Sequence, residues 1–147
     1  MTLATQRRGL FAGTAALEFA LAAPILMFLG LAAVDLALTI DARLRLGEAA
    51  RAGAHHAALA PWSEAGVTEA AARAVDLPVT VSAVRFSGCA GAQGVEPRAA
   101  CANGEPPGDY ARIIVTAQRQ PMIRLPLAKP LIEGALTLRA TTVTRTR

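Results

Sequence analysis

The stretch that decides the fold is residues 13–34, GTAALEFALAAPILMFLGLAAV, where a glycine is followed five residues later by the only charged side chain, Glu18. From Phe19 to Ile40 the chain has 22 residues with a single charge, Asp35. At 1.5 Å per helical residue, this length just spans a hydrocarbon core of roughly 30 Å. The stretch therefore predicts a transmembrane segment at 14–40. Glu18 stands at its start, where an acid is costly and indicates a function.

The charges that flank the apolar stretch predict its orientation. Arg7 and Arg8 precede it, which favours a cytoplasmic N-terminus. Arg43 and Arg45 follow it, and they weaken this contrast without reversing it. We therefore expect residues 41–147 to form an extracytoplasmic helix plus a small α+β domain.

Several kinds of N-terminal segment could account for this pattern. In a secretory signal, Glu18 would interrupt the apolar core, and the best small-residue site, Leu21-Ala22-Ala23, runs into Pro24. A twin-arginine signal at Arg7-Arg8 has the same difficulty. A plain uncleaved anchor fits the length. These alternatives stay open.

Three parts of the chain resemble the TadE-like proteins of tight-adherence pilus systems, which are small relatives of type IV pilins. They are Gly13, Glu18 and Pro24 at their spacing, then Arg51-Ala52-Gly53-Ala54, and finally Leu136-Thr137-Leu138-Arg139-Ala140. The resemblance implies that a prepilin peptidase removes residues 1–13 by cutting between Gly13 and Thr14. The chain departs from the family pattern at Asp35-Leu36-Ala37, where relatives usually carry a glutamate, an aromatic residue and a glycine.

The resemblance also implies a function and a location. Such proteins are minor pilins or pseudopilins of the inner membrane, and they help to initiate, prime or cap a pilus used in surface attachment. The implied partners are the prepilin peptidase, other pilin subunits, the inner-membrane assembly machinery and the lipid bilayer. Glu18 would pair with the new amine of Thr14 in a neighbouring subunit, and Pro24 and Asp35 belong to the same assembling helix. The alternative is an uncleaved, membrane-anchored domain that senses or binds something outside.

Beyond the membrane, the pattern predicts that the helix continues to about Leu59, because Pro61 is the next proline. Its stripe of Leu36, Ile40, Leu44 and Gly47 is expected to cover a sheet or another helix. Ion pairs are expected between Asp41 and Arg45 and between Glu48 and Arg51. Pro24 is expected to kink or loosen the turn that begins near Ala20.

A second helix is predicted from about Ser63 to Val75, with Ser63 or Thr68 as its cap. Strands are predicted at Val79–Ala83, Tyr110–Arg119 and Leu136–Thr144, with Ala111, Ile113, Val115 and Ala117 on one side of the second. The expected fold class is α+β, a long N-terminal helix packed on a short helix and a three-stranded antiparallel sheet. Between the last two strands, we expect an irregular segment whose apolar residues pack on the core or on a partner: Leu125, Leu127, Leu131 and Ile132.

Cys89 and Cys101 fall in a loop rich in Gly, Ala and Pro between the first two strands. Outside the cytoplasm, a disulfide is the natural interpretation. It would contribute up to roughly 3 kcal/mol through loop-closure entropy. Free thiols or a metal site are the alternatives, but zinc needs two more ligands, and the adjacent His55 and His56 point in different directions on a helix.

Composition narrows the classes of function. A mean hydropathy of +0.37 and 53% apolar residues are high for a soluble chain of 147 residues. The net charge of +4 is spread along the chain without a basic run, so nucleic acid is not an expected partner. No nucleophile elbow, phosphate loop or paired helical histidines occur, so we expect no enzyme, metal or cofactor.

Overall fold

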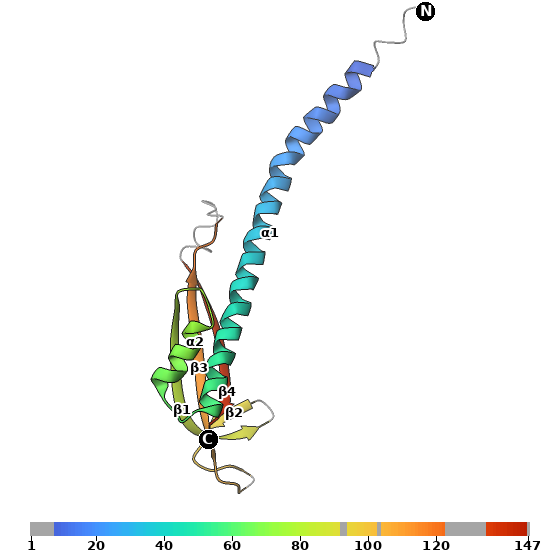
Figure 1. Ribbon diagram of the computed structural model, residues 1–147. Helices are drawn as coiled ribbons and strands as arrows, with labels where there is room; N and C mark the ends of the chain where they lie inside the picture. Colours follow the sequence, from blue (N-terminus) through green and yellow to red (C-terminus); the bar gives the residue numbers. More distant parts are fainter. Residues whose placement is uncertain (1–7, 92–93, 103, 123–134, 147) are drawn as a thin grey trace, which may run out of the picture. The chain divides into compact units, whose positions relative to one another are not determined.

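The computed structural model describes residues 8–91, 94–102, 104–122 and 135–146, with side chains from residue 15 onward. The elements run in the order α1 (Arg8–Leu59), α2 (Glu64–Arg73), β1 (Val79–Gly91), β2 (Gly94–Pro97), β3 (Gly108–Arg119) and β4 (Leu136–Arg145) (Figure 1). They form two compact units, Met1–Leu38 and Thr39–Arg147. The second unit contains the end of α1, all of α2 and the sheet. The fold class is α+β, as expected.

Helix α1 begins earlier than predicted, at Arg8 rather than Thr14, and ends at Leu59 as predicted. Pro24 lies inside it, and the helix continues on both sides of the ring. Proline removes one backbone hydrogen bond, and a membrane helix tolerates this better than a soluble one.

Helix α2 is capped by Ser63, whose side chain accepts a hydrogen bond from the backbone N–H of Gly66 at 3.3 Å. The other candidate cap, Thr68, lies inside the helix and donates its hydroxyl to the carbonyls of Glu64 and Ala65. Ser63 has the extended backbone typical of an N-cap residue, so the serine and not the threonine begins the helix.

The sheet has four strands rather than the predicted three, in the order β2-β1-β3-β4, with every neighbouring pair antiparallel. Strand β1 continues beyond its predicted end at Ala83 to Gly91. The unpredicted strand β2 then pairs with it from Gly91↔Gly94 to Gly88↔Pro97. Gly94 has a φ of +114°, which glycine adopts without steric cost. Four residues within a glycine-rich stretch are too few to show a strand period in the sequence.

The core of the second unit lies between one face of the sheet and the two helices. As predicted, Ala111, Ile113, Val115 and Ala117 of β3 are buried. Leu138 joins them from β4, whereas Leu136, two residues before it on the same side of the strand, is exposed. The helices contribute small residues around a few larger ones: Leu46, Ala49, Ala50, Ala57, Val67 and Ala71.

The predicted covering stripe of α1 is wrong. Ile40 is 51% exposed and Leu44 is 64% exposed, and Leu36 in the first unit is also exposed. The buried face instead runs through Ala42 and Leu46 to Ala57. Alanine and glycine let the helix axis lie close to the sheet, and this close approach leaves the larger aliphatic side chains on the opposite side. Leu125, Leu127, Leu131 and Ile132, predicted to pack on the core, lie outside the described residues.

Candidate assembly and binding sites

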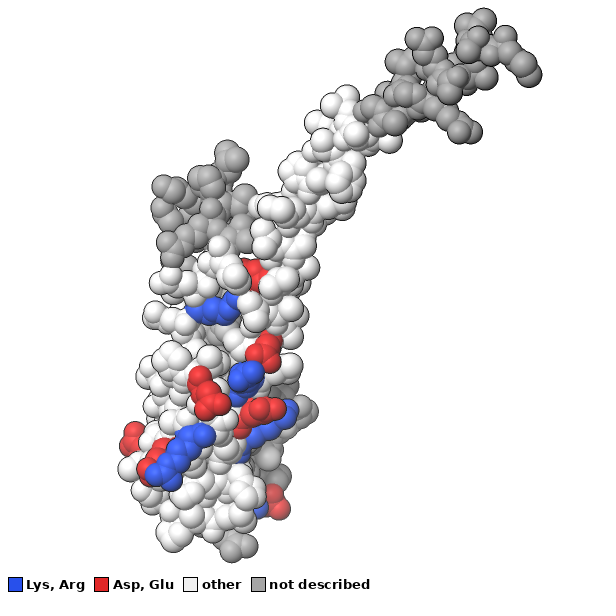
Figure 2. All heavy atoms as spheres, turned by 45° about the horizontal axis from the view of Figure 1, so that its top comes forward, with Lys and Arg blue, Asp and Glu red and all other residues white. Residues whose placement is uncertain are grey.

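The first candidate site is the apolar part of α1 in the first unit. Its large side chains are exposed, and Phe19, Leu21 and Met27 each expose more than three fifths of their surface. In the part of the chain that the structure describes, one helix is long and apolar enough to cross a membrane, and its most apolar stretch is entirely unburied. Figure 2 shows this stretch free of charged side chains on the face in view. Such a surface is the kind that lipid or other apolar helices cover.

The predicted processing and assembly residues all lie on this helix. Gly13 and Thr14 are inside α1, so the predicted cut site falls within helical backbone. Glu18 is exposed among the large apolar side chains, and Asp35 is half-buried. Thr14 and Glu18 are four residues apart, so they lie on the same side of the helix, one turn from each other.

The second unit begins where α1 becomes polar. Arg119 at the end of β3 donates a hydrogen bond to the hydroxyl of Thr39. Arg45 donates to Asp41 at 2.8 Å, which forms the first of the two expected ion pairs. The second expected pair, Glu48 with Arg51, is not among the ion pairs of the described side chains.

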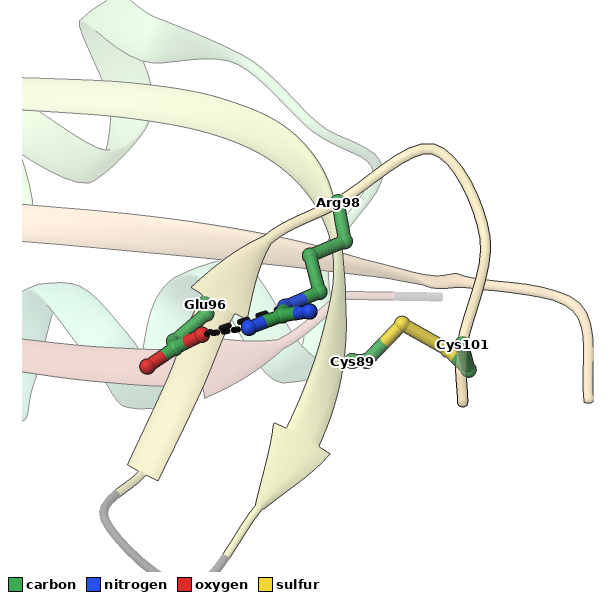
Figure 3. Close-up of a disulfide and its surroundings, with 4 residues drawn as sticks. All are labelled: Cys89, Glu96, Arg98 and Cys101. Atoms are coloured by element: carbon green, nitrogen blue, oxygen red, sulfur yellow. Dashed lines mark hydrogen bonds and ion pairs between the residues drawn. A yellow bond between two sulfur atoms is a disulfide. The ribbon is translucent and has the colours of Figure 1, made fainter. Parts of the chain in front are cut away.

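At the other end of the sheet, a disulfide joins Cys89 to Cys101 with a Cα–Cα distance of 5.6 Å (Figure 3). The predicted loop placement was wrong for Cys89, which lies on β1 opposite Glu96. Cys101 lies beyond β2, as the loop placement predicted. The bridge therefore ties the segment that follows the hairpin back onto the hairpin's first strand.

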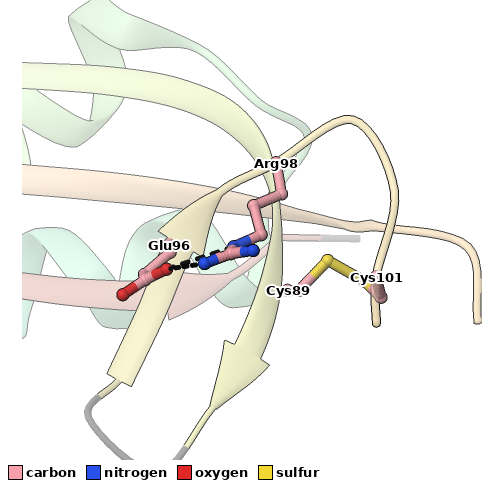
Figure 4. Close-up of polar contacts among 4 residues, drawn as sticks. All are labelled: Cys89, Glu96, Arg98 and Cys101. Atoms are coloured by element: carbon pink, nitrogen blue, oxygen red, sulfur yellow. Dashed lines mark hydrogen bonds and ion pairs between the residues drawn. A yellow bond between two sulfur atoms is a disulfide. The ribbon is translucent and has the colours of Figure 1, made fainter. Parts of the chain in front are cut away.

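A hollow of about 580 Å³ lies beside this bridge. Its lining comes from all four strands and includes Cys89, Glu96, Tyr110 and Arg145. Glu96 accepts hydrogen bonds from Arg98 at 2.7 and 3.1 Å (Figure 4). The carboxylate of Glu96 is therefore paired with a cation beside the hollow. The hollow is of the size that small ligands occupy.

A polar cluster stands next to the hollow, at the helix-covered side of the sheet. Arg85 donates to Asp109 at 2.8 Å, and Ser87 donates to the same carboxylate at 3.1 Å. The hydrogen bond from Arg85, that from Ser87 and the charge of Arg85 together hold the pKa of Asp109 below its ordinary value of 3.8. Neither the spacing nor the composition indicated this cluster, because antiparallel pairing of β1 with β3 brings its members together.

The described residues hold no group of three or more His, Cys, Asp and Glu side chains that could bind a metal. His55 is exposed. His56 is half-buried, and its Nε2 lies 2.7 Å from the point where a β-carbon on Gly66 would be. His56 therefore packs on the first turn of α2.

Comparison with protein families gives a match to the apolar part of α1. Residues 13–55 match the family of TadE-like proteins. The TadE-like segment begins at the glycine of the predicted cut and includes Glu18, Pro24, Asp35 and the run from Arg51 to Ala54. It covers less than a third of the chain, and the C-terminal residues that also suggested the resemblance lie outside it. Neither the curated proteins nor the solved structures gave a match.

Proposed function

We propose that this protein is a pilin-like subunit of a tight-adherence pilus, anchored in the membrane by α1 and processed by a prepilin peptidase. One observation carries the proposal. The TadE-like segment begins at Gly13, and Glu18 lies five residues later at the start of the exposed apolar stretch of α1. A lone acid in such a place needs a partner, which an assembly of like helices supplies.

The proposed topology has a basic leader at 1–13, a transmembrane segment at 14–40 and an extracytoplasmic part at 41–147. Arg7 and Arg8 favour a cytoplasmic N-terminus. The Cys89–Cys101 bridge supports the same orientation, because disulfides persist in oxidising compartments outside the cytoplasm.

The proposed cut lies inside the helix of the uncut chain, and a peptide bond in a helix must be freed before a peptidase can bind it. Glycine in a helix interior costs roughly 1 kcal/mol relative to alanine. Gly13 therefore makes local opening of the first turns easier. The new terminus at Thr14 would carry a cation one turn before Glu18.

In the assembled state, Glu18 would pair with the Thr14 amine of a neighbouring subunit. An isolated charge that is drawn into the bilayer costs a few kcal/mol. Pairing with an opposite charge offsets the cost of burying both groups. The chain would remain in the inner membrane beside other pilin subunits and the assembly machinery, or enter a pilus that attaches the cell to a surface. The second candidate, an uncleaved anchored binding domain, is favoured by the hollow at the disulfide end of the sheet.

Replacing Glu18 tests the pairing role. We expect Glu18→Ala to be cut as efficiently as the wild type but to lose most of its incorporation into pilus complexes, measured by co-purification with other subunits from membranes. Glu48→Ala is the matched control, because Glu48 is an exposed acid on the same helix beyond the apolar stretch. Normal incorporation of Glu18→Ala, or an equal loss in both variants, would contradict the pairing.

A further inference from the structure

The strand register assigns each side chain of the sheet to one of two faces. Residues directly opposite in antiparallel strands share a face, and successive residues alternate. Ala111, Ile113 and Val115 of β3 face the helices, since they are buried in the core. Tyr110, Arg112 and Thr116 therefore lie on the opposite face.

Three arginines lie on that opposite face, namely Arg112 on β3 and Arg139 and Arg145 on β4. Arg139 is paired with Thr116, and Arg145 is paired with Tyr110. None of the three forms an ion pair with a described carboxylate. The opposite-face positions of β1, β3 and β4 include no Asp or Glu. We call this surface the arginine face.

The arginine face is elongated. Arg139 and Arg145 are six residues apart on β4, which is about 20 Å at the usual rise of a strand. Hydroxyl side chains occupy the positions around them: Thr80, Ser82, Thr116, Thr137 and Thr141. At one end, Tyr110 and Arg145 also line the hollow beside the disulfide, which the carboxylates of Glu96 and Glu105 line as well. A line of cations among hydroxyl groups suits an extended polymer that carries both negative charges and hydroxyls.

We propose that the arginine face binds an acidic polysaccharide. Arginine forms charge-assisted, bidentate hydrogen bonds with carboxylate and sulfate groups, and the threonine and serine hydroxyls pair with sugar hydroxyls. The inference goes beyond the proposed pilus subunit, and binding in solution depends on neither the cut after Gly13 nor assembly.

The aromatic residues favour a polysaccharide over a single-stranded nucleic acid. Nucleic-acid platforms offer ring faces on which successive bases stack. Here the rings of Phe86 and Tyr110 are stacked on each other with centroids 6.0 Å apart. The guanidinium of Arg112 lies 5.1 Å from the Phe86 centroid, so it takes up part of the remaining ring surface. The guanidinium groups are left for a ligand, together with the hydroxyls that are not bonded within the sheet, as Thr116 is to the carbonyl of Thr80. The exposed apolar side chain of Val84 lies on the same face.

Binding of the full chain in neutral detergent to polygalacturonate tests the proposal, with neutral dextran and a single-stranded DNA oligonucleotide as competing probes. We expect polygalacturonate to bind at low salt and dextran not to bind. If three cations make contact, the logarithm of affinity falls with the logarithm of salt with a slope of about −2. The paired change Arg139→Gln with Arg145→Gln should reduce affinity at least about tenfold and bring the slope toward about −1.

A charge-matched control distinguishes binding at the arginine face from attraction by the net positive charge of the protein. The double variant Arg43→Gln with Arg51→Gln also removes two positive charges, but from exposed positions of α1. It should leave the affinity for polygalacturonate within about twofold of the wild type. Arg112 is left unchanged because it stacks on Phe86, and its replacement would also remove this contact within the sheet. Equal losses in the two double variants, tighter binding of DNA than of polygalacturonate, or no polygalacturonate binding at low salt would each overturn the proposal.

Discussion

Among the glycines of the sheet, Gly88 on β1 has the least room for a side chain. A β-carbon there would lie 2.5 Å from the carbonyl oxygen of Glu96 and 3.0 Å from a ring carbon of Phe86. The carbonyl belongs to the backbone of β2, so it cannot move without disturbing the pairing of the two strands. We predict that Gly88→Ala lowers the free energy of unfolding by roughly 1–3 kcal/mol.

The measurement is denaturant unfolding of the full chain in neutral detergent, followed by the fluorescence of the single tryptophan, Trp62, which packs against the core. Gly91→Ala is the control on the same strand, because its β-carbon would meet nothing closer than 3.7 Å. If both variants unfold at the same denaturant concentration, the close approach of Glu96 has no energetic consequence.

Asp109 provides a prediction about pH at the same scale. Its folded pKa lies below 3.8, because Arg85 and Ser87 donate hydrogen bonds to the carboxylate and Arg85 adds its charge. A lowered pKa contributes stability that is present above the unfolded value and is lost as pH falls through the folded value. We therefore expect stability to fall below about pH 4 less steeply in Asp109→Asn than in the wild type.

Acid titration of the unfolding free energy checks this expectation. Asp76→Asn is the control, since Asp76 is an exposed carboxylate without an ion pair among the described residues. Identical acid slopes in Asp109→Asn and the wild type would show that the cluster does not stabilise the fold.

At the scale of elements, two glycines of α1 allow the effect of helix propensity on stability to be separated from the effect of packing. A β-carbon on Gly47 would meet nothing within 4 Å, whereas one on Gly53 would lie 3.1 Å from Ala71 Cβ and 3.3 Å from the carbonyl of Val67. We predict that Gly47→Ala raises the free energy of unfolding by roughly 0.5–1 kcal/mol, because alanine favours the helix. Gly53→Ala should show no such gain, since α2 must shift away.

The same unfolding measurement compares these two variants. Equal stabilisation by both changes would show that α1 and α2 have room to spare at Gly53, contrary to the close packing of the small-residue face. A destabilised Gly47→Ala would instead count against the open space around that position.

The elements also show what the sequence could predict. Long apolar or alternating runs were found with their type and approximate bounds, as in α1 and β3, because their period continues over many residues. Helix α2 was found by its capping serine. The buried stripe of α1 could not be found by size, since alanine and glycine carry little hydrophobic signal and owe their burial to close contact with the sheet. Strand β2 was missed because it is four residues long and begins at a glycine with positive φ.

At the scale of the whole molecule, the two units differ in how far sequence could predict their roles. The acid and glycine of the first unit are neighbours along the chain, so their spacing is visible without a structure. The arginine face joins residues 112, 139 and 145, and only the pairing of β3 with β4 brings them to one surface. The net charge of +4 without a basic run therefore concealed a local concentration of cations.

The central claim is that α1 begins, in the mature protein, at Thr14. The most direct measurement is the intact mass of the full chain after co-expression with its prepilin peptidase, supported by N-terminal sequencing. We predict a mass equal to that of residues 14–147, with Thr14 at the new terminus. A chain that still begins at Met1, or one that begins just after Ala23, would contradict it.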